Sequence, residues 1–261
     1  MPFDFEEFDP KKLSTWIELI NFVPRFPIPY VLDCVCSCYL VRSSLNVITP
    51  ILSFVFTLFI ATLSDNLTSY GNNRKPAVFE HPWLIPVFSL VWFAYNMFPF
   101  DIVYFITKLL APIVVFVSGV LAGRDVCHGI DVGVNLFPSS TMPAFLFGIF
   151  FAFSKYISLF IFARTTKQDI RNVFIVLFEV TIGASLYYWL TDLGHISNTL
   201  WFDKEEMRLL VHLVLGLLEF VRHFLPDSVY EAIWGFFSKI VSYFIPYYGK
   251  TWTPEGQKIN S

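Results

Sequence analysis

The segment from Met142 to Ala163 reads MPAFLFGIFFAFSKYISLFIFA, a nearly unbroken apolar run whose only charged residue is Lys155. A helix needs about 20 mainly apolar residues to cross the hydrocarbon core of a bilayer. Since that core holds no water to satisfy backbone N–H and C=O groups, a helix is the conformation that such a run adopts. The segment therefore predicts a membrane-spanning helix.

Apolar runs of this kind recur along the whole chain. Pro99-Phe100-Asp101 ends one of them, and the stretches Asp65–Pro82 and Gly123–Pro138 are polar or Gly-rich enough to predict loops. The pattern predicts an all-α, polytopic membrane protein with seven transmembrane helices. We also expect the first three and second three spans to form two inverted three-helix repeats, although no sequence echo links them. The other six runs are Pro29–Val41, Val47–Ser64, Trp83–Phe98, Val103–Ala122, Val173–Leu190 and Met207–Leu225.

The ends of the chain differ from this core. Residues 1–28 are acidic and predict an extramembrane segment, followed by the transmembrane domain at 29–226. Residues 227–246 place apolar side chains at helical spacing and predict an amphipathic helix. Residues 247–261 are then a short tail.

Composition excludes several classes of protein. Of 261 residues, 55% are hydrophobic and 15% are charged, against about 25% charged in soluble domains. The net charge of -3 argues against nucleic-acid binding. No phosphate-binding loop, nucleophile elbow or i, i+4 histidine pair occurs, so we expect neither an enzyme nor a metal site. The C-x-C-x-C sequence Cys34–Cys38 is interpreted as packing residues.

Polar residues inside the spans are candidates for function, because such groups usually face a bundle interior or a water-filled path. Lys155 is the deepest, and it either lines a solute path or pairs with a carboxylate such as Glu179. Thr49, Ser53 and Thr57 share a helix face, which suits a pore wall and equally suits hydrogen bonding between helices.

Four further features lie near the predicted span ends. Asp33 and Asp101 are expected to be solvated at the membrane interface, and Arg124 with Asp125 is expected to form a pair at the edge of a loop. Asn66-Leu67-Thr68 is a glycosylation sequon, so Asn66 is a candidate acceptor in the loop after the second span.

One stretch resembles a known family. Trp92 to Asp101 reads WFAYNMFPFD, with a Trp in the third helix, a Pro seven residues later and an Asp two beyond. Phe26-Pro27 and Asp33 before the first helix and Asn46 at the start of the second agree in order. Together with the seven-span layout, these features resemble the trimeric intracellular cation (TRIC) channels over roughly residues 25 to 245.

The resemblance implies a homotrimeric, potassium-permeable channel with one pore per subunit, located in the endoplasmic or sarcoplasmic reticulum or the nuclear envelope. It implies that potassium ions act as counter-ions during calcium release. The family also binds phosphoinositide lipid through a K-E-V-x-R element on the fourth helix. The nearest match is Arg124–His128, which makes Arg124 and His128 the lipid-phosphate candidates.

Two departures from the family favour a second interpretation. TRIC channels carry glycine clusters in the second and fifth helices, whereas Ile60-Ala61-Thr62 and Ala152-Phe153-Ser154-Lys155 contain no glycine. Bulkier residues predict straighter helices and a narrower path. The alternative function is therefore a non-conducting membrane scaffold or channel subunit that retains the fold.

Overall fold

The structure, a computed structural model, describes residues 28–44, 49–138, 140–162, 167–191 and 204–226, together with 228, 229, 232 and 235. The chain forms two compact units, Met1–Phe220 and Val221–Ser261, and each is described by itself. The predicted extramembrane segment, most of the amphipathic helix at 227–246 and the whole tail lie outside the described residues. The domain boundaries therefore stay predictions.

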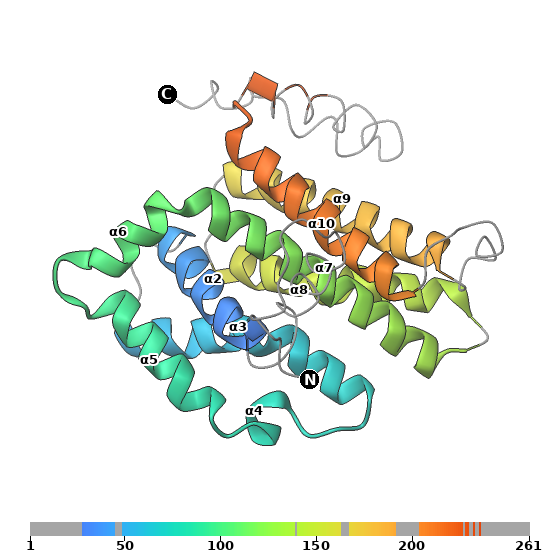
Figure 1. Ribbon diagram of the computed structural model, residues 1–261, viewed down its shortest axis with the longest axis horizontal. Helices are drawn as coiled ribbons and strands as arrows, with labels where there is room; N and C mark the ends of the chain where they lie inside the picture. Colours follow the sequence, from blue (N-terminus) through green and yellow to red (C-terminus); the bar gives the residue numbers. More distant parts are fainter. Residues whose placement is uncertain are drawn as a thin grey trace, which may run out of the picture. The chain divides into compact units, whose positions relative to one another are not determined.

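All regular structure in the described ranges is helical, which confirms the all-α prediction. Figure 1 shows the helices in their order along the chain. They are α2 (Ile28–Ser44), α3 (Pro50–Gly71), α4 (Ala77–Glu80), α5 (Leu84–Asn96), the 3-10 turn η2 (Pro99–Asp101), α6 (Ile102–Leu109), α7 (Ala111–Leu136), α8 (Thr141–Phe162), α9 (Lys167–Leu190) and α10 (Lys204–Phe224).

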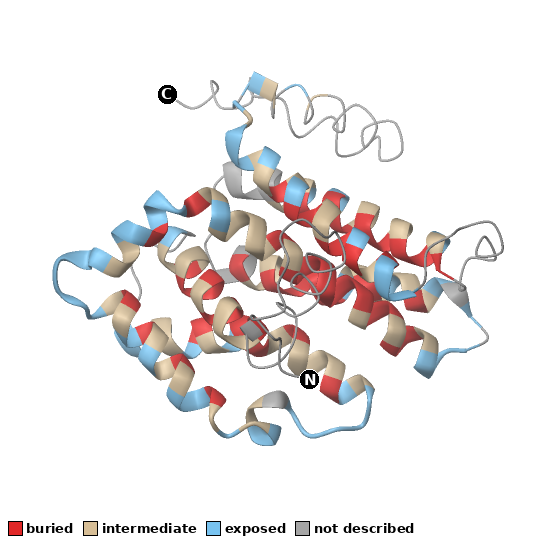
Figure 2. Cartoon of the chain, viewed as in Figure 1, coloured by how far each residue is buried: buried red, intermediate tan, exposed pale blue. Residues whose placement is uncertain are grey.

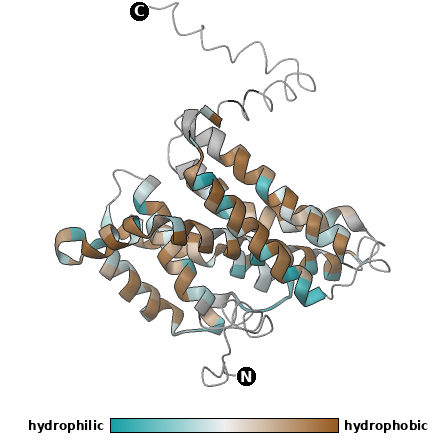
Figure 3. Ribbon diagram, turned by 45° about the horizontal axis from the view of Figure 1, so that its top comes forward, coloured by the Kyte–Doolittle hydropathy of each residue, from teal (hydrophilic) through white to brown (hydrophobic). Residues whose placement is uncertain are grey.

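Several of these helices are long and apolar enough to cross a membrane. Within the described ranges four helices pass by length and composition, namely α3, α7, α8 and α9. The bent pair formed by α5 with η2 and α6 raises the number to five if it counts as one span. Apolar residues cover most of the helical surface in Figure 3. The chain is thus a multi-pass integral membrane protein, and the number of seven spans stays a prediction.

The prediction that Pro99-Phe100-Asp101 ends a span is confirmed. The axes of the helices on either side of this break differ by 88°. Phe100 and Asp101 adopt positive φ angles of 60° and 55°, a left-handed conformation that is unfavourable for a bulky residue such as Phe. The turn therefore stores backbone strain, and Asp101 within it forms an ion pair with Arg42 of α2.

The predicted fourth span, Val103–Ala122, is wrong in its position. α6 ends at Leu109 and α7 begins at Ala111, with Pro112 in its first turn, where proline's missing N–H costs nothing. The predicted loop Gly123–Pro138 is also wrong, because α7 continues to Leu136.

Small residues explain why this Gly-rich stretch of α7 is helical. A Cβ added at Gly119 would lie 2.4 Å from the carbonyl oxygen of Leu215 in α10, and one at Gly129 would lie 2.6 Å from that of Phe147 in α8. Both glycines open a G-x-x-x-G spacing, so α7 packs closely against α10 through one pair and against α8 through the other.

Buried side chains form two main groups in the unit Met1–Phe220. One group joins α7, α8, α9 and α10 around Val126, Ile130 and Tyr187. The other joins α2, α3 and α5, and it contains Cys34 and Cys38 on one face of α2. Figure 2 shows these buried residues on the sides where helices face one another, while outer faces are exposed. Exposed apolar outer faces are what a lipid-facing surface requires.

Candidate functional site: a buried charge cluster

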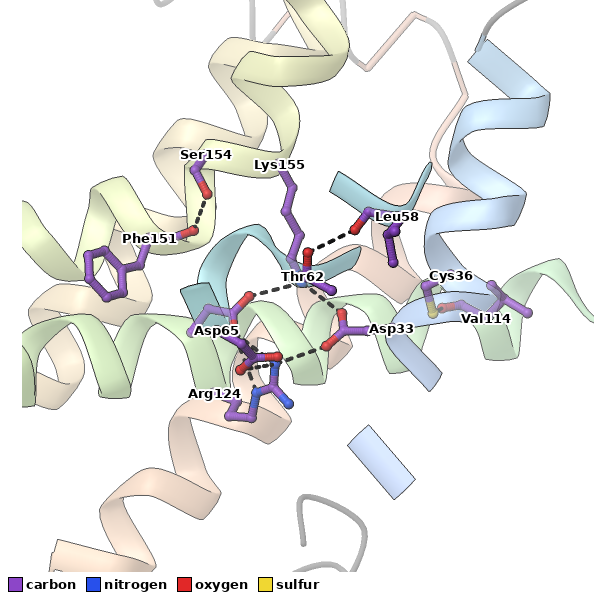
Figure 4. Close-up of polar contacts among 11 residues, drawn as sticks. Asp33, Cys36, Leu58, Thr62, Asp65, Val114, Arg124, Phe151, Ser154 and Lys155 are labelled. Atoms are coloured by element: carbon purple, nitrogen blue, oxygen red, sulfur yellow. Dashed lines mark hydrogen bonds and ion pairs between the residues drawn. The ribbon is translucent and has the colours of Figure 1, made fainter. Parts of the chain in front are cut away.

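Five charged side chains from four helices meet in the interior of the bundle (Figure 4). We call Asp33, Asp65, Arg124, Asp125 and Lys155 the charge cluster. α2 contributes the first carboxylate and α3 the second, α7 contributes the adjacent Arg–Asp pair, and α8 contributes the lysine. Residues distant in the sequence are thus joined inside a membrane protein, where charges are costly and must be paired.

The two cations bridge the carboxylates. Arg124 Nη2 lies 2.9 Å from Asp33 Oδ2, 3.1 Å from Asp125 Oδ1 and 3.5 Å from Asp65 Oδ1. Lys155 Nζ lies 2.7 Å from Asp33 Oδ1 and 3.1 Å from Asp125 Oδ2. Asp33 therefore binds both cations, one through each oxygen, and ties α2 to α7 and α8 at the same time.

The cluster carries more negative than positive groups. Three carboxylates face two cations, and the side chains of Asp33 and Asp125 are only 3% and 1% exposed. Among the described residues, Asp65 Oδ2 has no hydrogen-bond partner. In a buried ion pair, the attraction between the two ions must offset the cost of removing both from water. Asp65 is incompletely paired, so its remaining negative charge attracts a further cation.

Three sequence-based interpretations are corrected here. Asp33 is 2% exposed and ion-paired, so it is not solvated at the membrane interface. Arg124 and Asp125 lie in the middle of a helix in the interior of the bundle, and not at the edge of a loop. Lys155 pairs with carboxylates, as one of the two sequence interpretations held, but its partners are Asp33 and Asp125, and not the suggested Glu179. Partners on other helices replace the water that each charge would otherwise need.

The candidate pore wall on α3 runs from an exposed end towards the interior. Thr49 is exposed, Ser53 is half-buried and Thr57 is buried. The Thr57 hydroxyl donates to the Ser53 carbonyl at 2.6 Å, and Trp92 Nε1 donates to Ser53 Oγ at 3.4 Å. The Ser53 hydroxyl therefore links α3 to α5, and the Thr57 hydroxyl bonds within α3 itself. The role of these residues in a pore stays a prediction.

Asp65 is the member of the charge cluster that sequence reasoning missed. It was assigned to a loop, whereas α3 continues to Gly71. The signal was available in the helical spacing, since Thr57, Ala61 and Asp65 are each four residues apart and share one face. Each step of four residues turns the helix by about 40°, so Asp65 lies about 160° around α3 from Thr49 and does not continue the face of Thr49, Ser53 and Thr57.

The remaining candidates are more dispersed. Asn66 lies on α3, not in a loop, and its amide donates to Thr62 Oγ1 at 3.2 Å, while its glycosylation stays a prediction. His128 is half-buried one turn after Arg124 on α7. Asp101 is exposed as expected, and it forms a 2.7 Å ion pair with Arg42.

A second ionic group lies near the end of α7. Asp131 pairs with Lys204 at 2.8 Å and with Arg208 at 2.6 Å, both from the first turns of α10. The Tyr187 hydroxyl of α9 donates to Asp131 at 3.1 Å. This group is partly exposed and joins three helix ends, which suits a structural role.

Comparisons with known proteins identify the fold. No protein-family model and no curated protein sequence matches the chain. The solved structures that match include two of a trimeric intracellular cation channel from C. elegans. The one with bound Ca²⁺ is 14% identical with a TM-score of 0.59, covering 79% of this chain and 94% of that one. The one without Ca²⁺ is 14% identical with a TM-score of 0.61, covering 82% and 97%.

The described fold and these comparisons define the class of protein. The chain is a multi-pass helical membrane protein with a divergent TRIC-like fold, as the sequence resemblance predicted. Both solved structures are of ion channels, not of enzymes. At this level of identity the likeness concerns the fold, so function must be argued from the residues themselves.

Proposed function

We propose that the chain is a TRIC-like channel for monovalent cations, with potassium as the main permeant ion. The observation that carries the proposal is the buried charge cluster, which joins four helices and holds one more carboxylate than cations. A surplus of negative charge inside a low-dielectric bundle favours cations over anions. The fold supports the same proposal, because it covers nearly all of the solved cation channels.

The finer features of the proposal follow the family resemblance. We expect seven spans, with α2, the α5–α6 pair and α10 completing the four long apolar helices. Two inverted three-helix repeats would then surround a path in each subunit. We further propose a homotrimer in the endoplasmic or sarcoplasmic reticulum or the nuclear envelope, supplying potassium counter-ions during calcium release.

A non-conducting scaffold or channel subunit is the second candidate. α3 and α8 are each a continuous helix of 22 residues, so neither is broken at the positions where the sequence lacks glycine. In addition, Lys155 is held by two ion pairs across the middle of the bundle. Both observations favour a closed interior over an open path.

Phosphoinositide binding at Arg124 and His128 is a separate proposal, taken from the family resemblance. The residues present do not fit a phosphate in the arrangement described, because three carboxylates already hold the Arg124 guanidinium. A lipid phosphate would have to displace them. Cosedimentation with vesicles containing phosphatidylinositol bisphosphate, compared for the wild type and Arg124→Gln, tests the proposal.

Potassium flux distinguishes the channel from the scaffold. Purified protein is reconstituted into liposomes loaded with potassium, and efflux is followed after addition of a proton ionophore. A channel gives efflux that scales with protein density, with chloride excluded. Absence of efflux from a preparation that crosslinks as a folded oligomer supports the scaffold and contradicts the channel.

A further inference from the structure

A cavity of about 590 Å³ lies where α3 and α7 end and α8 begins, and no member of the charge cluster lines it. Its volume falls in the range of sites that hold small molecules, about 300–1,000 Å³. The residues around it are mainly apolar and come from all three helices. They include Leu67, Tyr70, Leu136, Leu146, Phe147 and Phe150.

The cavity opens on the outer surface of the bundle. Leu146 and Phe150 are 53% and 50% exposed, and they lie one turn apart on α8. Because α8 is long and apolar enough to cross the bilayer, its exposed apolar face meets lipid hydrocarbon. The open side of the cavity is therefore accessible to a lipid chain without passage through water.

Polar and cationic groups follow immediately at the end of α3. Tyr70 is 84% exposed, which suits the amphipathic ring at a membrane–water interface. Asn73 lines the cavity, and the next two residues, Arg74 and Lys75, are exposed cations. Lysine and arginine at the level of the headgroups attract anionic lipids. Apolar cavity and cationic rim thus match the two parts of an anionic phospholipid.

We propose that this cavity binds an acyl chain of an anionic phospholipid whose phosphate contacts Arg74 and Lys75. A phospholipid is favoured over a second copy of the chain, because its acyl chain matches the apolar walls from α7 and α8. Its phosphate matches the cations at the rim. The lipid fills the space between the ends of α3, α7 and α8.

Native mass spectrometry of the full-length protein in detergent tests the proposal, with dioleoyl phosphatidylglycerol and dioleoyl phosphatidylcholine as probes. The wild type should retain one phosphatidylglycerol per subunit at least tenfold more tightly than phosphatidylcholine. Leu146→Trp fills the cavity, so this variant should bind phosphatidylglycerol no more tightly than phosphatidylcholine. Leu90→Trp is the matched control, since Leu90 is 72% exposed on α5 and does not line the cavity.

A double variant, Arg74→Gln with Lys75→Gln, should bind both lipids equally, which separates the rim from the cavity. If Leu146→Trp fails to fold, Leu67→Trp fills the same cavity from α3. Tight phosphatidylglycerol binding that survives both filling variants would overturn the proposal. So would a wild type that binds no lipid while Phe150→Cys crosslinks between copies, because a second copy would then cover the cavity.

Discussion

The charge of Lys155 is balanced by Asp33 and Asp125, two carboxylates that are buried away from water. Removing one partner of a buried ion pair leaves an uncompensated charge, which costs about 3–5 kcal/mol. We therefore expect Lys155→Met to lower the free energy of unfolding by about this amount. Thermal unfolding in detergent measures the effect, with Lys108→Met, an exposed lysine on α6, as the control. Equal stability of the two variants would contradict the pairing.

Asp65 is the least closely paired of the three carboxylates, because its ion pair with Arg124 is 3.5 Å long. Neither Asp65 Oδ2 nor Asp125 Oδ2 has a hydrogen-bond partner among the described residues, but Asp125 Oδ2 has a 3.1 Å ion pair with Lys155. Neutralising Asp65 leaves two carboxylates and two cations. We expect Asp65→Asn to unfold at or above the wild-type temperature, whereas Asp33→Asn should destabilise by about 3–5 kcal/mol. Similar losses of stability for both variants would contradict the assignment of the surplus negative charge to Asp65.

At the scale of elements, α7 is the central helix, and its glycines set how closely α8 and α10 approach. We expect Gly129→Ala to destabilise the protein by about 1–3 kcal/mol, since the new Cβ meets the α8 backbone. Gly235→Ala is the control, because a Cβ there would meet no atom of the described residues within 4 Å. The comparison is made by thermal unfolding, and it fails if the two variants melt together.

The sequence predicted some elements well and others poorly, for physical reasons. The apolar run around Lys155 could be identified as a helix from its own sequence, without knowledge of the helices that pack against it. Pro99-Phe100-Asp101 ends a helix because of its local backbone preferences. By contrast, the stretch after Gly123 reads as a loop because glycine and charged residues favour loops when water surrounds them. They are helical here because α8 and α10 pack on the glycines, and because the charges pair with residues on other helices.

The same reasoning explains what was missed in the charge cluster. Lys155 was identified from its depth in an apolar run, but its partner Asp33 is 122 residues away in the sequence. No local pattern encodes such a pairing. Only the fold shows that charges from four helices meet, and that α3 is long enough to bring Asp65 to them.

At the scale of the whole molecule, the family resemblance implies an assembly of three copies, each with its own ion path. We expect the purified protein to be a trimer by light scattering in detergent, with the mass of the bound detergent subtracted. A monomer at concentrations used for reconstitution would contradict the proposed assembly, but it would leave a path within each subunit open to test.

Single-channel recording in planar bilayers with asymmetric potassium chloride tests the central claim most directly, that the charge cluster lies on a cation path. The account predicts cation-selective openings in the wild type. It also predicts that Lys155→Gln, which adds to the negative surplus, raises potassium conductance at least twofold, while Lys108→Gln leaves it unchanged. Openings identical in both variants, or none from a folded oligomer, would contradict the account.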